Sequence, residues 1–471
     1  MLPLADGPAT SLDKLYLTLR PDPLMGPEQL QRFYRGQVNE VRGADTVKRL
    51  SRELQQAYRA VPFRAFVMGH PGVGKSTEIT RLLERVKDQH VGVRLNVAAE
   101  LNPASFKIFD VLILMLARLA EQANELGAVP LGGVEQLVSG VERWFGTEKH
   151  TETHKRSTTA GVEAGAGIKG DSPWAALLGL FASAKAEVRY AADRQTETVS
   201  ERLRRLPELV ALCNRLIELC GSRLYETTGK EWLLIIEDLD KTVISPPELR
   251  ELFVQYGNVL RDLRISMIFT IPVWLAYSPA AVQLPFERYM IPDTPVYDRR
   301  HLPHLEGRAA VRTVLEARVS PDLFAEGQMM RLIVASGGNL RDLFDMVRDA
   351  GNWALDRDST ASVIGPADVR SAIGKMRVEY LRRLGESPYD ATTISYADKR
   401  TKLLAVYNDE PDNGVLDAVS YSLLRGRAVQ EFNGERWCGV HPLVVDILKQ
   451  QKHLPENAPG GTDERDESGI D

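Results

Sequence analysis

Residues 63–80 read FRAFVMGHPGVGKSTEIT, and this stretch decides how the rest of the chain is interpreted. Residues 65–68 form a short apolar run of the kind found in buried parallel strands. The run is followed by a glycine-rich loop and then by a predicted helix. Backbone N–H groups at the start of such a helix, together with the helix dipole, favour the binding of an anion. The helix is predicted because apolar residues recur after Lys75 at helical spacing: Ile79, Leu82, Leu83 and Val86.

The loop between the predicted strand and helix has the complete pattern of a P-loop, or Walker A motif. Its glycines let the main chain approach a phosphate closely and adopt positive φ. Lys75 would reach the β- and γ-phosphates of a nucleotide, and the hydroxyl of Ser76 would bind Mg²⁺. A glycine-rich loop that arose by chance is the alternative, which the flanking strand and helix disfavour. The expected phosphate-binding residues are Gly69, His70, Pro71, Gly72, Val73, Gly74, Lys75, Ser76 and Thr77; His70 has no catalytic role.

A second motif, WLLIIEDLDK at residues 232–241, has an apolar run followed by acids, which is the form of a Walker B motif. A central strand would deliver these carboxylates to its C-terminal end, where open α/β sheets bind ligands. Glu237 is placed to hold Mg²⁺, and Asp238 is placed to orient or deprotonate the attacking water. Asp240 is a spare carboxylate. The alternative is an ordinary core strand that ends in a polar turn.

Two further runs predict strands of the same sheet. Residues 91–97 alternate between apolar and polar side chains, and residues 265–271 form a mostly apolar run that contains Thr270 at its end. A polar side chain there can touch the γ-phosphate or the attacking water, although a threonine that caps the strand explains the pattern equally well. Helices are predicted over residues 106–119 and 197–224.

The region from residue 146 to about residue 190 is expected to be an insertion that projects from this core. Residues 146–171 are rich in Thr, Gly, Ala and His and show little helical period. Residues 160–169 and 185–190 could pair as a weak hairpin. The insertion is either a mobile surface loop or an element that contacts a partner or substrate.

The segments on either side of the core are mainly helical. The N-terminal lead-in has a break near Gly43 and could lie against the nucleotide. Near the C-terminus two helices precede a hairpin at Asn433-Gly434, which is the order of a winged helix. The last residues are polar and acidic, so a disordered tail is expected. The predicted units are the helical lead-in (1–62), the core (63–300), a helical lid (301–385), a winged-helix-like domain (386–453) and the tail (454–471).

The composition is that of a globular protein of about two to four domains. The chain has 471 residues, of which 44% are hydrophobic and 26% are charged. A net charge of −5 argues against a broad nucleic-acid-binding surface, though not against a local one. Three cysteines without a C-x-x-C pattern argue against a disulfide framework or zinc site. With no signal-peptide pattern and no apolar stretch long enough to span a bilayer, a cytoplasmic location is expected.

Taken in order, GHPGVGKST, WLLIIEDLDK, FTIP and SGGNLRDL resemble the P-loop ATPases of the AAA+ and STAND types. Origin-recognition-like and KAP- or NACHT-like bacterial proteins are the most similar in pattern. The resemblance covers roughly residues 63–355 apart from the insertion. It implies an α/β fold with a three-layer ASCE P-loop core, a helical lid and a C-terminal winged-helix-like domain, and it implies ATP and Mg²⁺ as cofactors.

The resemblance also implies roles for individual residues. Thr270 corresponds to the sensor 1 position, and Arg341 corresponds to sensor 2, the lid arginine that contacts the γ-phosphate. Arg288 is placed like an arginine finger, which would act on a neighbouring subunit; a solvated surface charge is the alternative. The chain departs from the family pattern at Glu237, where the Walker B motif usually has Asp.

The predicted function is that of a Mg²⁺-dependent ATPase that switches conformation or assembly in a bacterial defence or signalling system. It would work as a homo-oligomer or on a partner effector protein. We prefer ATP to GTP because no guanine-recognition signature stands out. One alternative is a nucleotide-locked scaffold with little turnover. The other is a DNA-associated ATPase that acts through its winged helix and the basic residues Lys375, Arg377, Arg382 and Arg383.

Overall fold

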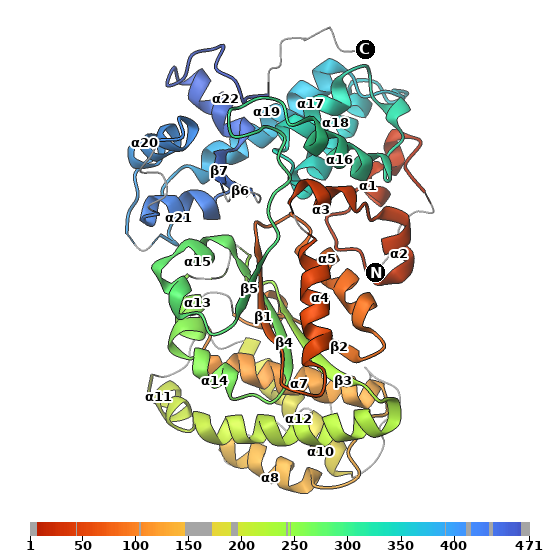
Figure 1. Ribbon diagram of the computed structural model, residues 1–471, viewed down its shortest axis with the longest axis vertical. Coiled ribbons are helices and arrows are strands. Elements are labelled where there is room, and N and C mark those ends of the chain that lie inside the picture. The colour runs from red at the N-terminus through yellow and green to blue at the C-terminus, as the bar shows by residue number, and fades with distance from the viewer. Residues whose placement is uncertain are drawn as a thin grey trace.

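The computed structural model describes residues 7–43, 45–102, 105–146, 172–189, 196–241, 244, 246–390, 392–410, 416–432 and 437–462. Across these residues the molecule is organised around one parallel β-sheet with helices on both of its faces (Figure 1). Two further groups of helices lie beyond one edge of this sheet. The carboxyl ends of parallel strands meet at one edge, where ligands bind in folds of this kind.

The central sheet has five strands in the described part of the chain, and all of them are parallel. Their order is β2-β3-β4-β1-β5, so one strand separates the P-loop strand from the strand that carries the acids. This is the arrangement of the ASCE P-loop core that we expect from the sequence, and the predicted strands are confirmed. The strands are β1 (Arg64–Gly69), β2 (His90–Asn96), β3 (Glu231–Glu237), β4 (Ser266–Pro272) and β5 (Glu287–Met290).

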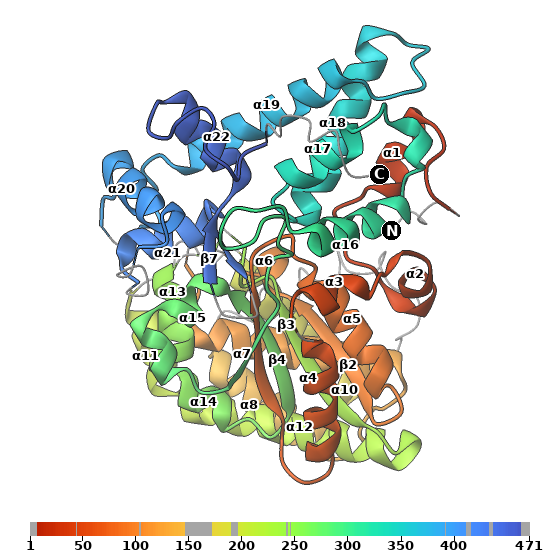
Figure 2. The same ribbon diagram turned by 45° about the horizontal axis from the view of Figure 1, so that its top comes forward.

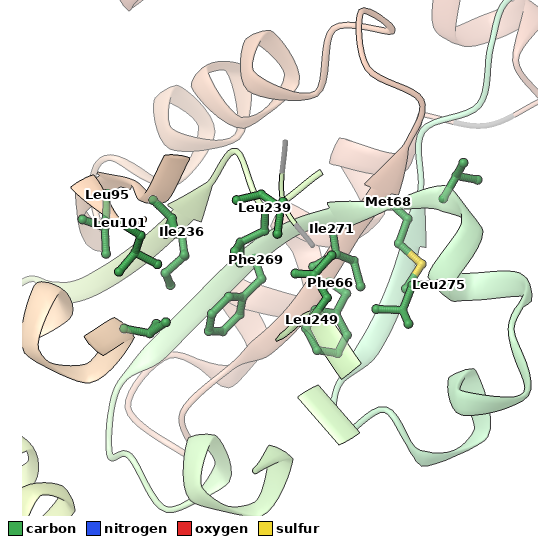
Figure 3. Packing of buried hydrophobic residues seen from close by; sticks show 14 of the residues in the cluster. Phe66, Met68, Leu95, Leu101, Ile236, Leu239, Leu249, Phe269, Ile271 and Leu275 are labelled. Atoms are coloured by element: carbon green, nitrogen blue, oxygen red, sulfur yellow. The ribbon is translucent and has the colours of Figure 1, made fainter. Parts of the chain in front are cut away.

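Successive residues of the central strands point to opposite faces of the sheet, which creates two apolar cores. Ala65 and Val67 of β1 pack in the core formed by α4 (Thr46–Ala57) and α5 (Lys75–Val86). Phe66 points the other way and joins the larger core (Figure 3). Its ring contacts those of Phe253, Phe269 and Phe286.

Helices from the segment between β2 and β3 pack on one another over the second face of the sheet (Figure 1). One of them corrects the prediction of a projecting insertion. Residues 185–189 belong to α10 instead of a hairpin strand, and Trp174, Leu177 and Phe181 of that helix are buried. Residues 147–171 and 190, including the proposed partner strand, lie outside the described residues. The helices of this layer are α7 (Ile108–Glu125), α8 (Val134–Phe145), α10 (Pro173–Arg189) and α12 (Leu206–Thr228).

The helix predicted over residues 197–224 is divided in two, α11 (Thr196–Arg204) and α12. Pro207 explains the division, because proline lacks an N–H and is favoured in the first turn of a helix. Short helical segments complete the core: α6 (Val97–Glu100), α13 (Pro246–Arg250), a π-helical turn (Glu251–Gln255), α14 (Gly257–Arg261), α15 (Val273–Tyr277) and a 3₁₀ turn (Pro279–Gln283).

The N-terminal lead-in lies between the P-loop helix and the lid. Its helix α2 contacts α5. Two other helices contact the lid: α3 contacts α16 (Leu305–Glu316), and α1 contacts α18 (Leu340–Arg357). Residues 28–60, predicted to be helical with one break near Gly43, contain two breaks, one after α2 and one after α3. The side chain of Asp45 caps α4 by accepting a hydrogen bond from the N–H of Lys48 (2.9 Å). Its elements are a 3₁₀ turn (Leu12–Lys14), α1 (Leu15–Thr18), α2 (Gly26–Phe33) and α3 (Gln37–Val41).

The helical lid lies over the C-terminal edge of the sheet (Figure 2). Its second long helix begins where the side chain of Asn339 accepts a hydrogen bond from the N–H of Asp342 (3.3 Å). The lid consists of α16 (Leu305–Glu316), a 3₁₀ turn (Pro321–Leu323), α17 (Gln328–Ala335), α18 (Leu340–Arg357) and α19 (Pro366–Arg383).

The C-terminal module contains two helices, a hairpin and a final helix. The two strands pair antiparallel with Phe432 opposite Trp437, as predicted, while the Asn433-Gly434 turn lies outside the described residues. Strand β6 is buried against the lid, where the Nε2 atom of Gln430 donates to the carbonyl of Gly337 (2.9 Å). The elements are α20 (Tyr396–Tyr407), α21 (Ala418–Arg425), β6 (Val429–Phe432), β7 (Trp437–Val440) and α22 (Pro442–Gln450).

The start of the expected disordered tail is ordered. Thr462 is buried, and its N–H and hydroxyl both bond the carboxylate of Asp446 on α22. The carbonyl of Gly461 accepts a hydrogen bond from Tyr297, and that of Pro459 accepts one from Tyr407. The polar composition of this segment predicted disorder because composition does not reveal hydrogen bonds to residues distant in sequence. Those hydrogen bonds order the segment. Residues 463–471 lie outside the described residues.

The described helices include none that is long and apolar enough to cross a membrane. Cys213, Cys220 and Cys438 are free thiols. Burial raises the pKa of the Cys220 thiol to about 12, so this group stays protonated and unreactive at neutral pH.

Replacing Phe66 with alanine should lower the free energy of unfolding by about 3–5 kcal/mol, because the cavity left among the aromatic rings cannot close fully. Urea denaturation measures this change. Leu131→Ala is the matched control, since Leu131 is 86% exposed, and it should change stability by less than about 0.5 kcal/mol. Equal stability of the Phe66 variant and the wild type would contradict the assignment of this core.

Candidate functional site

The P-loop connects β1 to α5 at the C-terminal edge of the sheet, as predicted. Lid and loop touch directly at Gly72, where a Cβ atom would lie 2.4 Å from Oδ1 of Asn339 and 2.8 Å from the Cβ of Arg341. Gly72 also has a φ of 92°, so only glycine fits both the conformation and the space. The Nδ2 atom of Asn339 donates to the carbonyl of Pro71 (3.0 Å). The start of α18 is therefore held against the loop.

A cavity of about 770 Å³ opens beside the P-loop, a size typical of small-molecule sites. The lead-in, the P-loop, the ends of β2 and β3 and the lid each contribute to its wall. Gly69 and His70 are not among its lining residues, whereas the rest of the predicted loop is. Of the predicted site residues, the wall contains Pro71, Gly72, Val73, Gly74, Lys75, Ser76, Thr77, Glu237, Asp238 and Arg341.

The ammonium group of Lys75 is buried and has a full set of acceptors. It donates to the carbonyls of Gly69 (2.9 Å) and His70 (2.8 Å), and it forms an ion pair with Asp240 (2.7 Å). Because an ammonium has three N–H donors, these contacts satisfy it without a ligand. Asp240, predicted to be a spare carboxylate, is thus the direct partner of the P-loop lysine.

The carboxylate of Glu237 is held by a residue that we did not predict. Arg94 of β2 places its Nε atom 2.6 Å from Oε2 of Glu237. The other oxygen, Oε1, is buried and has no hydrogen-bond partner within the described structure. Buried polar atoms are normally satisfied, so this oxygen is an acceptor available to a ligand.

Thr270 links the remaining acids. Its Oγ1 accepts the N–H of Asp238 (3.1 Å) and lies 3.4 Å from Oδ1 of Asp240, to which it donates. Asp238 has a φ of 70°, a left-handed conformation that Asp adopts more readily than most residues. Its carboxylate pairs with Lys241 (2.8 Å). Thr270, the predicted sensor 1 residue, therefore fixes the turn that carries Asp238 and Asp240.

The residues present fit a magnesium ion. The described residues contain no group of three or more His, Cys, Asp or Glu side chains arranged to hold a metal. Magnesium in nucleotide sites needs only one or two protein ligands, since phosphates and water supply the others. Ser76 and Glu237 both line the cavity, and the unpartnered Oε1 of Glu237 is a suitable oxygen ligand.

Arg288 lies apart from the cavity. It is exposed on β5, the edge strand of the sheet, and its Nη1 atom donates weakly to the carbonyl of Ala281 (3.4 Å). It does not contribute to the wall of the cavity in the same chain. A role for Arg288 at a nucleotide would therefore require a second subunit.

His70 is buried behind the P-loop and faces Asp293, with 3.9 Å between Nε2 and Oδ2. Both nitrogens of His70 and both oxygens of Asp293 lack hydrogen bonds within the described structure. Burial, with Arg427 and Lys75 nearby, lowers the pKa of His70 to about 3. Burial also raises the pKa of Asp293 to about 6, although Arg42 opposes this shift. The histidine is therefore neutral at pH 7 and the aspartate is a buried charge.

Two buried arginines from distant parts of the chain hold the P-loop, and sequence patterns did not reveal them. Arg42 of the lead-in donates to the carbonyl of Val73 (3.0 Å). Arg427 of the C-terminal module donates to the carbonyl of Pro71 (3.4 Å) and to Asp342 of the lid (2.8 Å). Neither belongs to a local motif, so only the folded structure identifies them.

The basic residues considered for DNA binding all have protein partners. Lys375 pairs with Asp349 (2.8 Å), and Arg382 pairs with Glu379 (2.5 Å). Arg377 lies 4.0 Å from Asp446, and the guanidinium of Arg383 lies over the ring of Tyr380. These four basic residues therefore do not form a patch of unpaired cations.

No protein-family model matches the chain, and no curated protein matches it in sequence. Solved structures to which it is similar include the Orc1 protein of Aeropyrum pernix in complex with DNA (14% identity, 93% of this chain, 96% of that chain, TM-score 0.38). Another is a Walker-type ATPase of Pyrococcus abyssi (11% identity, 92% of this chain, 99% of that chain, TM-score 0.37). A third is the RuvB Holliday junction branch migration motor of Thermotoga maritima (11% identity, 92% of this chain, 98% of that chain, TM-score 0.34).

These likenesses are remote, and the α/β P-loop fold is identified by the chain's own strand order and motifs.

Replacing Asp240 with asparagine should tighten ATP binding by about tenfold, because the phosphates no longer compete with a carboxylate for Lys75. Titration calorimetry under conditions without turnover measures the affinity. Asp238→Asn is the comparison, since Asp238 pairs with Lys241 and its removal leaves Lys75 bound to Asp240. Unchanged or weaker binding by the Asp240 variant would show that the pair does not compete with the ligand.

Replacing Asp293 with asparagine should stabilise the fold at pH 7 by up to about 3 kcal/mol. The folded pKa of about 6 exceeds the ordinary 3.8, so the folded state holds the proton more tightly. The destabilisation is therefore absent near pH 4, grows between pH 4 and 6 and is complete above pH 6. Unfolding followed from pH 4 to 8 tests this, with exposed Asp356→Asn as the control. A variant less stable than the wild type at pH 7 would contradict it.

Proposed function

We propose that this chain binds ATP in the cavity beside the P-loop and hydrolyses it with the help of Mg²⁺. One observation carries the proposal. Lys75, the acids that follow β3 and Thr270 converge at the C-terminal edge of the sheet, beside a cavity that is also lined by Arg341 of the lid. A single site thus contains the groups needed to bind a triphosphate and to position water.

Each group has a role in this proposal. The P-loop N–H groups and Lys75 bind the phosphates, while Ser76 and Glu237 hold Mg²⁺, which when bound neutralises charge on the phosphate oxygens. Asp238 orients the attacking water and accepts its proton, and Thr270 fixes the turn that carries Asp238. Arg341 contacts the γ-phosphate from the lid. Binding requires Lys75 to exchange Asp240 for phosphate.

The contacts of the P-loop support a role as a conformational switch. The carbonyl of Pro71 accepts hydrogen bonds from Asn339 of the lid and from Arg427 of the C-terminal module. A change in the loop on nucleotide binding would therefore alter contacts with both units. We propose that this change controls assembly with further copies of the chain or with an effector protein in a defence or signalling pathway.

The contacts of the basic residues near the C-terminal module bear on the DNA-binding alternative. A DNA-associated role has no specific support here, because Lys375, Arg377, Arg382 and Arg383 all have partners within the chain. A scaffold that retains its nucleotide remains the alternative to a turning-over ATPase, and the experiment below separates the two.

Purified protein should hydrolyse ATP, and Lys75→Ala should abolish turnover because the phosphates lose their main counter-charge. Phosphate release is measured over a wide range of protein concentration. If subunits complete one another's sites, specific activity rises with concentration, and Arg288→Ala removes this rise. Arg215→Ala, on the far side of the sheet, is the control and should behave as the wild type.

A specific activity that does not depend on protein concentration would contradict the role of Arg288 in a neighbouring site. The chain would then be an ATPase that needs no second subunit. ATP binding without turnover would favour the scaffold. Absence of both binding and turnover would contradict the proposed function.

A further inference from the structure

Arg94 reaches from β2 into the nucleotide cavity and connects several of the elements around it. Besides Glu237, its guanidinium donates to the hydroxyl of Thr80 (2.9 Å) and to the carbonyl of Ser76 (3.3 Å) on α5. Nη1 also lies 3.2 Å from the sulfur of Met25 in the lead-in. These contacts fix the orientation of the side chain, which is only 20% exposed.

The contact between Arg94 and Glu237 is one of three carboxylate–cation pairs at the C-terminal edge of the sheet. Three carboxylates lie within four residues at the end of β3, and each of them has its own cation. Asp238 pairs with Lys241 and Asp240 pairs with Lys75, while Glu237 pairs with Arg94 at the shortest distance of the three (2.6 Å). Without these cations, the acids would repel an anionic ligand.

The three pairs differ in what a nucleotide does to them. A triphosphate that binds the P-loop would draw Lys75 away from Asp240. Arg94 lies on β2, outside the P-loop, so phosphate binding to the loop leaves the Arg94–Glu237 pair in place. In many nucleotide sites the carboxylate at the position of Glu237 depends on magnesium for its charge compensation. Here the compensating charge belongs to the protein itself.

We propose that Arg94 is the resident counter-cation of Glu237, so that this chain binds ATP tightly without magnesium. Arg94 holds Oε2 of Glu237 and leaves Oε1 open, so magnesium would add to a carboxylate whose charge is already compensated. Nucleotide capture is consequently separate from formation of the metal-loaded state. This inference rests on the proposed function.

The test is the affinity of a fluorescent ATP analogue for the full chain, measured in EDTA and again in excess Mg²⁺. Wild-type affinities should agree within about threefold, since Arg94 already neutralises Glu237. Arg94→Met should lose about tenfold or more in EDTA because an unpaired carboxylate then faces the phosphates, and it should bind like the wild type in Mg²⁺. Arg85→Met, at the far end of α5, is the matched control.

The double variant Arg94→Met/Glu237→Gln distinguishes charge compensation from direct contact with phosphate. With the acid removed, affinity in EDTA should return to the wild-type value. A defect that persists in the double variant would overturn the proposal, because it would mean that Arg94 acts on the phosphates or on the fold. Glu237→Gln alone should bind at least as tightly as the wild type in EDTA, which tests the idea even if Arg94→Met does not fold.

Wild-type binding that requires Mg²⁺ would overturn this inference and leave the nucleotide site intact. Equal losses for Arg94→Met in EDTA and in Mg²⁺ would also overturn it. Absence of binding in both conditions would instead defeat the proposed function on which it rests.

Discussion

The ion pair between Lys75 and Asp240 is the interaction on which the rest of the site depends. A parallel sheet brings the carboxyl ends of its strands together, so the acids after β3 and the loop after β1 meet at one edge. Three carboxylates gathered there need compensating charge, and removing one partner of the buried Lys75–Asp240 pair leaves the other charge unpaired. Lys75, Arg94 and Lys241 provide that compensation from three different elements.

The carbonyls on the outer side of the P-loop carry a second set of contacts. Arg42, Asn339 and Arg427 come from the lead-in, the lid and the C-terminal module, and each donates to a loop carbonyl. The carbonyls of the loop thus hold the surrounding units. This arrangement explains why units far apart in sequence pack around one short loop (Figure 2).

Local patterns predicted the parts of the fold that local chemistry determines. The strand, loop and helix around Lys75 and the run that ends at Glu237 are each contiguous, so periodicity was sufficient to place them. The partner of Glu237 was missed because it depends on the register of β2 beside β3, which no single segment encodes. Helix α10 was missed because it is apolar on several sides, and the order near Thr462 depends on a distant carboxylate.

A crystal structure with a slowly hydrolysed ATP analogue and Mg²⁺ would test the central claim most directly. The account predicts a triphosphate along residues 71–77, with the ammonium of Lys75 moved from Asp240 to the phosphates. An analogue bound elsewhere, or a Lys75–Asp240 pair that persists beside bound triphosphate, would contradict it.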